Sequence, residues 1–411
     1  MKKNILVLLL LFVAALTGAS ATGLKSGIWH AAIVNDSGIE VPFLFEVKNL
    51  GGKMTLDIMN GGERLHVDEI RTEGDSVFIS MPFFDSEFRA LLKEKTTLSG
   101  NWVRHLVSGQ STMPFHAEYG NTERFPKSAV SAGVNISGLY KISYPGREKY
   151  SVGEFTQDAT GKVTGSILNT DGDYRFLEGR MKGDSVYLST FDGSHCFLFT
   201  ARYYKSGDSL SGGSFFLGKS SVRSWSAQKD AHAALPDAYS LTSMKPGENT
   251  LAFHFKDLKG KEVSLTDRQF KNKVVIIQFM GSWCPNCMDE TAFLSKFYRK
   301  YSNKVAIVGL AYERTTDFAT SRKSLDHFVK RFGVEYPVLV TGYTNDPEQV
   351  LVSMPALKNY VAFPTTVILG KDGRVSRIHT GFSGPGTGKY FTEFEEEFTA
   401  MILHLSAEPG L

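Results

Sequence analysis

Short runs of β-branched and aromatic residues recur throughout the first half of the chain. Each run spans five to nine residues, and turn clusters such as Asn60-Gly61-Gly62 separate one run from the next. This pattern predicts antiparallel strands joined by tight turns. Residues 22–125 and 126–227 each contain roughly eight strand candidates and no convincing helical stretch.

These two segments are copies of one unit. Residues 52–80 align without gaps to residues 161–189, and twelve of those 29 positions are identical. A match of this length indicates a duplicated unit. Eight short antiparallel strands commonly close into a barrel, which removes exposed edges. We therefore expect two tandem all-β meander units, at 22–125 and 126–227, that form barrels, sandwiches or one larger shared sheet.

The hydrophobic pattern changes in the second half. Residues 228–249 are polar, contain two prolines and show no sustained period, so they are predicted to be a linker. In residues 250–411 apolar strand runs alternate with stretches of helical periodicity, which is typical of an α/β domain with a mixed sheet. The predicted strands are 252–255, 263–265, 273–279, 305–311, 337–340, 365–369 and 375–379, with helices after 287, around 325–332 and over 391–405.

The N-terminus has the pattern of an export signal. Lys2 and Lys3 precede an apolar run over residues 5–16, and the small residues 19–21 match a cleavage site. We expect residues 1–21 to be a signal peptide and the mature protein to be exported to the periplasm. An uncleaved N-terminal anchor is the alternative.

Charge and cysteine content narrow the range of functions. The chain of 411 residues has 46 basic and 43 acidic side chains, and its net charge of +3 becomes +1 without Lys2 and Lys3. This near-neutral balance argues against nucleic acid or anionic lipid as the main partner. Three cysteines in an exported chain do not make a disulfide scaffold.

Two of the three cysteines carry the candidate chemistry. Residues 283–287 read Trp-Cys-Pro-Asn-Cys, directly after the apolar strand and directly before an amphipathic helical stretch. A helix N-terminus lowers the pKa of the first thiol, here Cys284, and makes it a nucleophile. The second thiol, Cys287, lies one turn into the helix and can resolve a mixed disulfide. The predicted chemistry is thiol–disulfide exchange.

From about residue 251 to 405 the chain resembles the thioredoxin superfamily, and within it the exported TlpA/ResA-like branch. The resemblance rests on residues 255–261, on residues 281–287 and on the downstream Phe363-Pro364-Thr365. It implies a thioredoxin-like fold and a thiol–disulfide oxidoreductase that needs neither a cofactor nor a metal. It does not extend to the duplicated β half.

The resemblance assigns three catalytic positions. Cys284 matches the nucleophile, Cys287 matches the resolving cysteine, and Glu290 matches an acidic residue behind the active site. A half-buried carboxylate at Glu290 would have a raised pKa and could carry the proton of Cys287. Alternatively, Glu290 is an ordinary first-turn glutamate that the helix dipole favours. Thioredoxin has a buried aspartate where this chain has Gln278, which shifts the expected proton transfer to Glu290.

The same resemblance implies a substrate-binding surface. Pro364 matches the proline that adopts a cis bond beside the disulfide, and the backbone of Phe363 would pair with an extended substrate strand. Trp283 matches the aromatic residue that shields the disulfide. Pro285 and Thr365 complete the predicted set.

Three other interpretations of these motifs are weaker. A structural zinc site needs a second ligand cluster, which the sequence lacks. Peroxidase chemistry of the peroxiredoxin type needs a Pro-x-x-x-Thr-x-x-Cys approach, whereas residues 279–283 lead to Cys284 without that proline and threonine. The Gly-rich residues 383–389 have Ser383 and Tyr390 where a phosphate-binding loop needs Gly and Ser or Thr.

The remaining predictions concern partners. The resemblance favours a reductant of envelope protein disulfides, for example in cytochrome c maturation, with an upstream electron donor at the inner membrane. In a second hypothesis the β units bind an envelope partner or ligand, and the redox domain only serves that complex. Deleting residues 22–227 would distinguish the two. Cys196 is expected to be a small buried hydrophobic residue.

Overall fold

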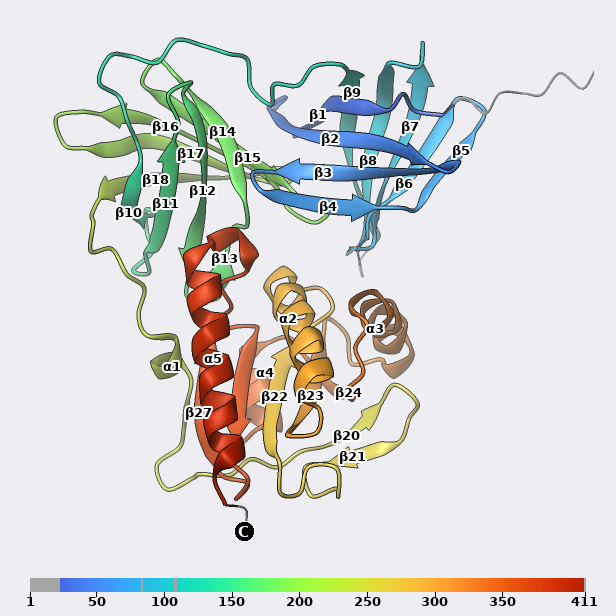
Figure 1. The fold of residues 1–411 in the computed structure, drawn as a ribbon, viewed down its shortest axis with the longest axis vertical. Coiled ribbons are helices and arrows are strands. Elements are labelled where there is room, and N and C mark those ends of the chain that lie inside the picture. Colours follow the sequence, from blue (N-terminus) through green and yellow to red (C-terminus); the bar gives the residue numbers. More distant parts are fainter. Residues whose placement is uncertain (1–22, 83, 107–108, 410–411) are drawn as a thin grey trace, which may run out of the picture.

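The computed structural model describes residues 23–82, 84–106 and 109–409. Within them the chain forms two β units at one end and an α/β domain at the other (Figure 1). This arrangement confirms the predicted fold class. The expected signal peptide lies outside the described residues. In the part of the chain that is described, no helix is long and apolar enough to cross a membrane.

The first β unit is an antiparallel sheet of nine strands, counted over the described residues, in the order β4-β3-β2-β1-β9-β8-β7-β6-β5. The strands are β1 (Gly27–Val34), β2 (Glu40–Leu50), β3 (Lys53–Asn60), β4 (Glu63–Val67), β5 (Ile70–Glu73), β6 (Ser76–Ser80), β7 (Ser86–Lys93), β8 (Thr97–Leu106) and β9 (Gly109–Tyr119). The first and last strands pair, and the two edge strands are consecutive in the chain. The sheet therefore nearly closes around a core that includes Trp29, Phe43 and Trp102.

The second β unit closes fully. Its strands are β10 (Gly138–Ser143), β11 (Ser151–Gln157), β12 (Lys162–Asn169), β13 (Gly172–Asp173), β14 (Leu177–Lys182), β15 (Ser185–Phe191), β16 (Cys196–Tyr204), β17 (Ser209–Leu217) and β18 (Ser221–Lys229). Pairing of β11 with β12 completes a barrel, which leaves few exposed edges. Its core includes Tyr140, Trp225 and the stacked rings of Phe199 and Phe215.

The sequence repeat coincides with equivalent strands. Strand β3 begins at Lys53 and β12 begins at Lys162, which are paired positions of the repeat, and β6 and β15 correspond in the same way. The copies differ at one hairpin. Strand β4 has five residues, whereas its counterpart β13 has only two before the chain leaves the sheet.

The α/β domain has a mixed sheet in the order β21-β20-β24-β23-β22-β26-β27. Its strands are β20 (His254–Asp257), β21 (Glu262–Ser264), β22 (Val274–Met280), β23 (Val305–Glu313), β24 (Val338–Thr344), β26 (Thr365–Leu369) and β27 (Val375–Thr380). The helices are α2 (Pro285–Tyr301), α3 (Phe318–Phe332), α4 (Pro347–Ser353), the short 3-10 turn η1 (Pro385–Thr387) and α5 (Lys389–Ala407). Each predicted strand and helix of this domain is confirmed, with bounds that shift by a few residues.

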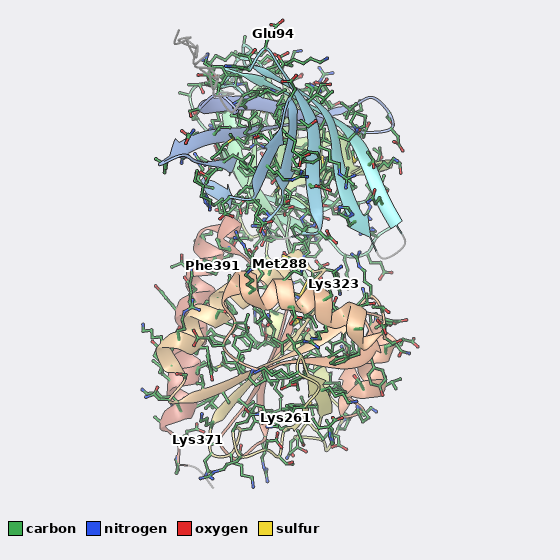
Figure 2. The ribbon with its side chains drawn as sticks, turned by 90° about the vertical axis from the view of Figure 1, so that its right-hand side faces the viewer. Glu94, Lys261, Met288, Lys323, Lys371 and Phe391 are labelled. Atoms are coloured by element: carbon green, nitrogen blue, oxygen red, sulfur yellow. A yellow bond between two sulfur atoms is a disulfide. The ribbon has the colours of Figure 1, made fainter. Side chains whose placement is uncertain are left out.

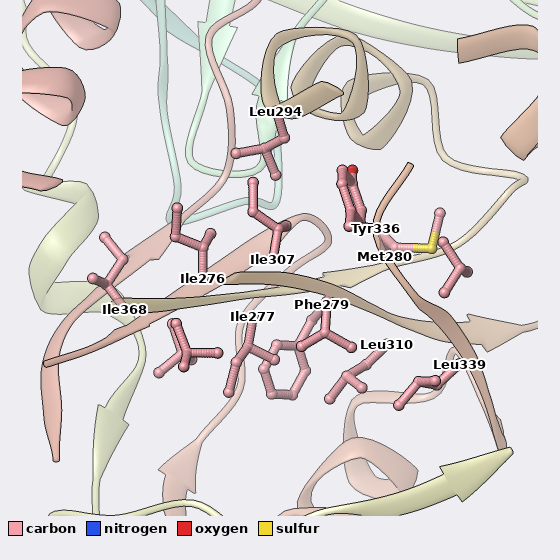
Figure 3. Close-up of a cluster of buried hydrophobic side chains, with 14 of the residues drawn as sticks. Ile276, Ile277, Phe279, Met280, Leu294, Ile307, Leu310, Tyr336, Leu339 and Ile368 are labelled. Atoms are coloured by element: carbon pink, nitrogen blue, oxygen red, sulfur yellow. The ribbon is translucent and has the colours of Figure 1, made fainter. Parts of the chain in front are cut away.

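Apolar side chains cover both faces of the central strands. Ile276 and Ile277 are neighbours on β22, so they point to opposite faces. In Figure 3 Ile276 lies on the side of Leu294 from α2, whereas Ile277 lies on the side of Phe279 and Leu310. Burial on both faces explains why every residue of this strand except Gln278 is apolar.

The linker is packed against the α/β domain. Its short helix α1 (Ala238–Leu241) is followed by β19 (Ser243–Met244), which pairs with β25 (Leu357–Asn359). The hydroxyl of Thr380 also donates to Thr242 over 2.8 Å. The linker therefore holds a defined path between the second β unit and the α/β domain.

Candidate active site

The two cysteines lie where strand β22 passes into helix α2. Cys284 is the N-cap residue, and its Sγ accepts a hydrogen bond from the Cys287 N–H over 3.2 Å. Pro285 occupies the first turn, where its missing N–H is not needed. The cysteines form a disulfide with a Cα–Cα distance of 5.2 Å, and they are 4% and 0% exposed. Positive potential at the helix N-terminus would stabilise a thiolate on Cys284.

Trp283, which precedes Cys284, packs against residues of other segments. Its indole N–H donates to the Tyr312 carbonyl over 2.9 Å, and its ring meets Phe363 edge to face at 5.5 Å. The guanidinium of Arg314 lies 5.5 Å from the ring centroid. Residue 281 must be glycine, because an added Cβ would lie 2.1 Å from the indole nitrogen. The sequence predicted Trp283 and Phe363, and the structure places them in contact.

A buried carboxylate holds the loop before Cys284. The Ser282 N–H and hydroxyl donate to the two carboxylate oxygens of Glu313 over 2.7 and 2.8 Å. Burial raises the pKa of Glu313. Sequence reasoning did not identify Glu313, although an acidic residue that ends an apolar strand beside the active-site edge was an available signal.

The Phe363–Pro364 peptide bond is cis, as the resemblance implied. The Pro364 carbonyl accepts from the Gly381 N–H over 2.8 Å, which joins this loop to the segment after β27. Thr365 is fully buried, and its hydroxyl donates to the Ala362 carbonyl over 2.7 Å. The Thr365 side chain therefore shapes the loop from inside.

Glu290 lies on α2, behind the disulfide, and is 1% exposed. The expectation of half burial was therefore wrong: the carboxylate is enclosed. The Thr366 hydroxyl donates to its Oε1 over 2.7 Å, and the Gln278 side-chain amide donates to its Oε2 over 2.8 Å. The same amide lies 3.4 Å from the Cys287 carbonyl oxygen. Gln278 thus joins Glu290 to the backbone of Cys287.

This setting changes the acidity of Glu290. Burial raises the pKa of the Glu290 carboxyl to about 7, although hydrogen bonds from Thr366 and Gln278 oppose the rise. A carboxyl with this pKa exchanges its proton near neutral pH. No pattern in the sequence indicated Thr366, whereas Gln278 was visible as a polar residue in an apolar strand. Buried polar side chains need partners, and such a residue therefore indicates a polar neighbour.

The third cysteine is separate from this site. Cys196 is free and buried, and it belongs to the core cluster of the first β unit. Burial raises the pKa of its thiol well above the ordinary value. Among the described residues, no group of three or more His, Cys, Asp or Glu side chains is arranged to hold a metal ion.

Known proteins resemble this chain over only part of its length, and the matching family model lies within the α/β half. A family model described as Redoxin matches residues 245–393. The thioredoxin-like protein YneN of Bacillus subtilis (strain 168) is 28% identical over 138 residues, 34% of this chain and 73% of that protein. The thiol-disulfide oxidoreductase ResA of Bacillus thuringiensis subsp. konkukian is 31% identical over 135 residues, 32% of this chain and 68% of that protein. A solved thiol-disulfide oxidoreductase from Bacteroides fragilis NCTC 9343 is 17% identical, covers 36% of this chain and 99% of its own, and has a TM-score of 0.28.

Proposed function

Because the chain belongs to the TlpA/ResA-like family of thiol–disulfide oxidoreductases, we propose that it is an exported reductant of protein disulfides that uses Cys284 and Cys287 as its redox pair. The disulfide at the N-terminus of α2 carries this proposal, since a helix N-terminus stabilises a thiolate at that position. The buried Glu290 behind it supports the assignment of a proton carrier.

The reaction consists of two thiol–disulfide exchanges. The reduced enzyme attacks one substrate sulfur with the Cys284 thiolate, forms a mixed disulfide and releases the other substrate sulfur as a thiolate. The Cys287 thiolate then attacks Sγ of Cys284, which forms the Cys284–Cys287 disulfide and releases the second substrate thiolate. Two electrons pass from the enzyme dithiol to the substrate disulfide. An upstream dithiol donor at the membrane must reduce the enzyme again.

Glu290 takes the proton of Cys287 in the second exchange. Its pKa of about 7 leaves a useful fraction ionised at neutral pH, so the carboxylate can act as the base. Gln278 contacts both Glu290 and the backbone of Cys287, and thereby keeps the two residues in register.

The substrate binds across the loop that contains the cis proline. The Phe363 backbone pairs with an extended substrate segment, and Trp283 and Pro285 form the rim around Cys284. Thr365 contributes by fixing the loop conformation through its bond to Ala362. Envelope proteins with cysteine pairs, such as apocytochromes c, are the substrate class that we assign.

The reduction potential of the Cys284–Cys287 couple tests the direction of the reaction. Redox titration of the full chain with glutathione or dithiothreitol should give a value near or below about −250 mV. A value of about −120 to −180 mV is typical of oxidases and isomerases and would reverse the assignment.

Substitution of each cysteine tests the mechanism. Cys284→Ser should abolish turnover, because the thiolate that attacks the substrate is lost. Cys287→Ser should trap mixed disulfides with the substrate, because the resolving thiol is missing. Turnover that survives Cys284→Ser would exclude the mechanism.

A further inference from the structure

A turn of the second β unit lies on the rim of the active site. This turn, residues 169–173, joins β12 to β13 and is called the second-unit turn. The side-chain amide of Asn286, which lies between the two cysteines, donates to the Asp171 carbonyl over 3.2 Å. Gly172 is so close that an added Cβ would lie 1.9 Å from the Asn286 side-chain nitrogen.

The same turn also touches the segment after β27. An added Cβ on Gly381 would lie 2.6 Å from the Thr170 carbonyl oxygen. The Gly384 N–H donates to Asp173 over 2.8 Å in a buried contact. Because the Gly381 N–H itself bonds to the Pro364 carbonyl, the turn borders two of the loops around the disulfide.

Arg175 holds the turn in place from the second unit. Its guanidinium reaches Asp289 on α2 at 2.7 Å, Glu63 of the first unit at 2.5 Å and Asp192 of its own unit at 3.4 Å. Burial lowers the pKa of Arg175, but the carboxylates of Asp289, Glu63 and Asp192 raise it well above its usual value, so the side chain stays charged. A buried charge with partners from three units fixes their relative positions. In Figure 2 Met288, the neighbour of Asp289, lies at the end of the α/β domain that faces the β units.

We propose that the second-unit turn is a substrate-selecting wall beside Cys284. The turn blocks the approach to Cys284 from the side of Asn286 and Gly381. A substrate disulfide therefore reaches Cys284 only from the side of Trp283 and Phe363. The class of substrate that fits is a disulfide in a flexible, extended protein segment. A disulfide in the middle of a broad folded surface would collide with the second β unit. This inference rests on the proposed function, because it concerns how substrates reach the same cysteine.

Access to Cys284 can be measured without turnover. The reduced full-length protein is treated with N-ethylmaleimide or with a maleimide attached to a long polyethylene glycol chain, and modification of Cys284 is followed by peptide mass. The two maleimides have the same reactive group and differ only in bulk. Their ratio of rates therefore reports steric access.

Two variants displace the turn in different ways. Gly386→Val adds a side chain where a Cβ would already meet the Arg175 and Phe176 backbone at 2.9 Å, so it forces the second unit away from the α/β domain. Asp173→Ala removes the acceptor of the Gly384 N–H. Gly207→Ala is the matched control, because its Cβ meets only the Ser209 hydroxyl, at 3.5 Å.

We expect the wild type to react slowly with the bulky maleimide relative to the small one. Each displacing variant should accelerate the bulky reagent by about tenfold, which corresponds to about 1.4 kcal/mol of lost docking free energy, and leave the small reagent unchanged. The control should match the wild type. Equal ratios in all four proteins would overturn the proposal, as would equal acceleration of both reagents, which reports thiol reactivity. If the wild type did not reduce disulfides at all, the proposed function would be contradicted, but the measurement of access to Cys284 would still be valid.

Discussion

The two copies of the β unit use one equivalent turn to contact two different neighbours. In the first copy this turn, residues 60–63, contacts the second unit: the Gly61 N–H donates to Glu178 over 2.8 Å, and the Asn60 amide donates to the Phe191 carbonyl over 2.7 Å. In the second copy the turn contacts the α/β domain beside the disulfide. Each copy is therefore joined to the next unit through the same hairpin, but only the second contact lies beside reacting atoms.

The hairpins differ where the second one leaves its sheet. Strand β4 continues through His66, which pairs with Asp57 on the neighbouring strand and is half exposed. The equivalent position in the second copy is Arg175, which is buried and has a positive φ of 59°. An exposed strand residue in one copy has become the buried junction of three units in the other. Duplication thus supplied a docking element that only one copy uses at the active site.

The largest effect on stability is expected when Arg175, the residue at the junction of the three units, is replaced. Arg175→Met should lower the free energy of unfolding by about 3–5 kcal/mol, because it leaves the carboxylates of Glu63, Asp192 and Asp289 without their buried partner. His66→Met at the equivalent position of the first copy should cost less than about 1 kcal/mol, because the His66 ring is half exposed and Asp57 keeps its contact with Lys48. Urea unfolding of both variants measures the difference. Similar losses would show that the copies do not differ in this way.

A second variant, Glu290→Gln, tests proton transfer without changing the contacts of Arg175. Glu290→Gln should slow formation of the Cys284–Cys287 disulfide by about 100-fold above pH 7, because the base is lost, and should flatten the pH profile near pH 7. The small maleimide should still modify Cys284 at the wild-type rate. Stopped-flow tryptophan fluorescence can follow the reaction. An unchanged pH profile would reduce Glu290 to a structural residue.

Glu290→Gln should slow the reaction but should increase the stability of the folded protein at high pH. The folded-state pKa of Glu290, about 7, lies above the ordinary 4.5, so the folded protein binds this proton more tightly than the unfolded chain does. Stability is therefore lost as pH rises from about 4.5 to about 7. Glu290→Gln removes a penalty of up to about 3 kcal/mol at pH 8 and should have no such effect at pH 4. Thermal unfolding at the two pH values measures it.

A second pH effect on stability is expected at the junction, where Asp289 contacts Arg175. Burial, together with the charges of Asp173 and Glu63, raises the pKa of Asp289 to about 7 although Arg175 is adjacent. Ionisation of Asp289 between about pH 4 and pH 7 should therefore destabilise the fold as pH rises. Asp289→Asn should remove up to about 4 kcal/mol of this decline, because the attraction of Arg175 is already contained in the pKa of about 7. It should leave disulfide chemistry unchanged, in contrast to Glu290→Gln.

The sequence predicted more of the fold than of these contacts, for a physical reason. Periodicity reports which face of a strand or helix is buried, so the meander units and the α/β elements were recognisable. Periodicity does not report whether a sheet closes, because closure depends on the pairing of strands such as β11 and β12. The sequence therefore did not distinguish a barrel from a sandwich. The redox pair could be read from adjacent residues. The enclosure of Glu290 by Thr366 and Gln278, and the contact of Asn286 with Asp171, join distant segments for which no local pattern exists.

The smallest expected effect concerns a peripheral contact of the same interface. Lys389 at the start of α5 pairs with Glu154 of the second unit at 2.9 Å, and both side chains are substantially exposed. Solvent and salt screen such a pair, so Lys389→Ala should lower the free energy of unfolding by less than about 1 kcal/mol and should not change access of the bulky maleimide to Cys284. Glu154→Gln serves as the partner control. If either variant opened the site as far as Gly386→Val does, exposed charges and not the second-unit turn would hold the β unit over the active site, and the contrast between the two copies would lose its functional meaning.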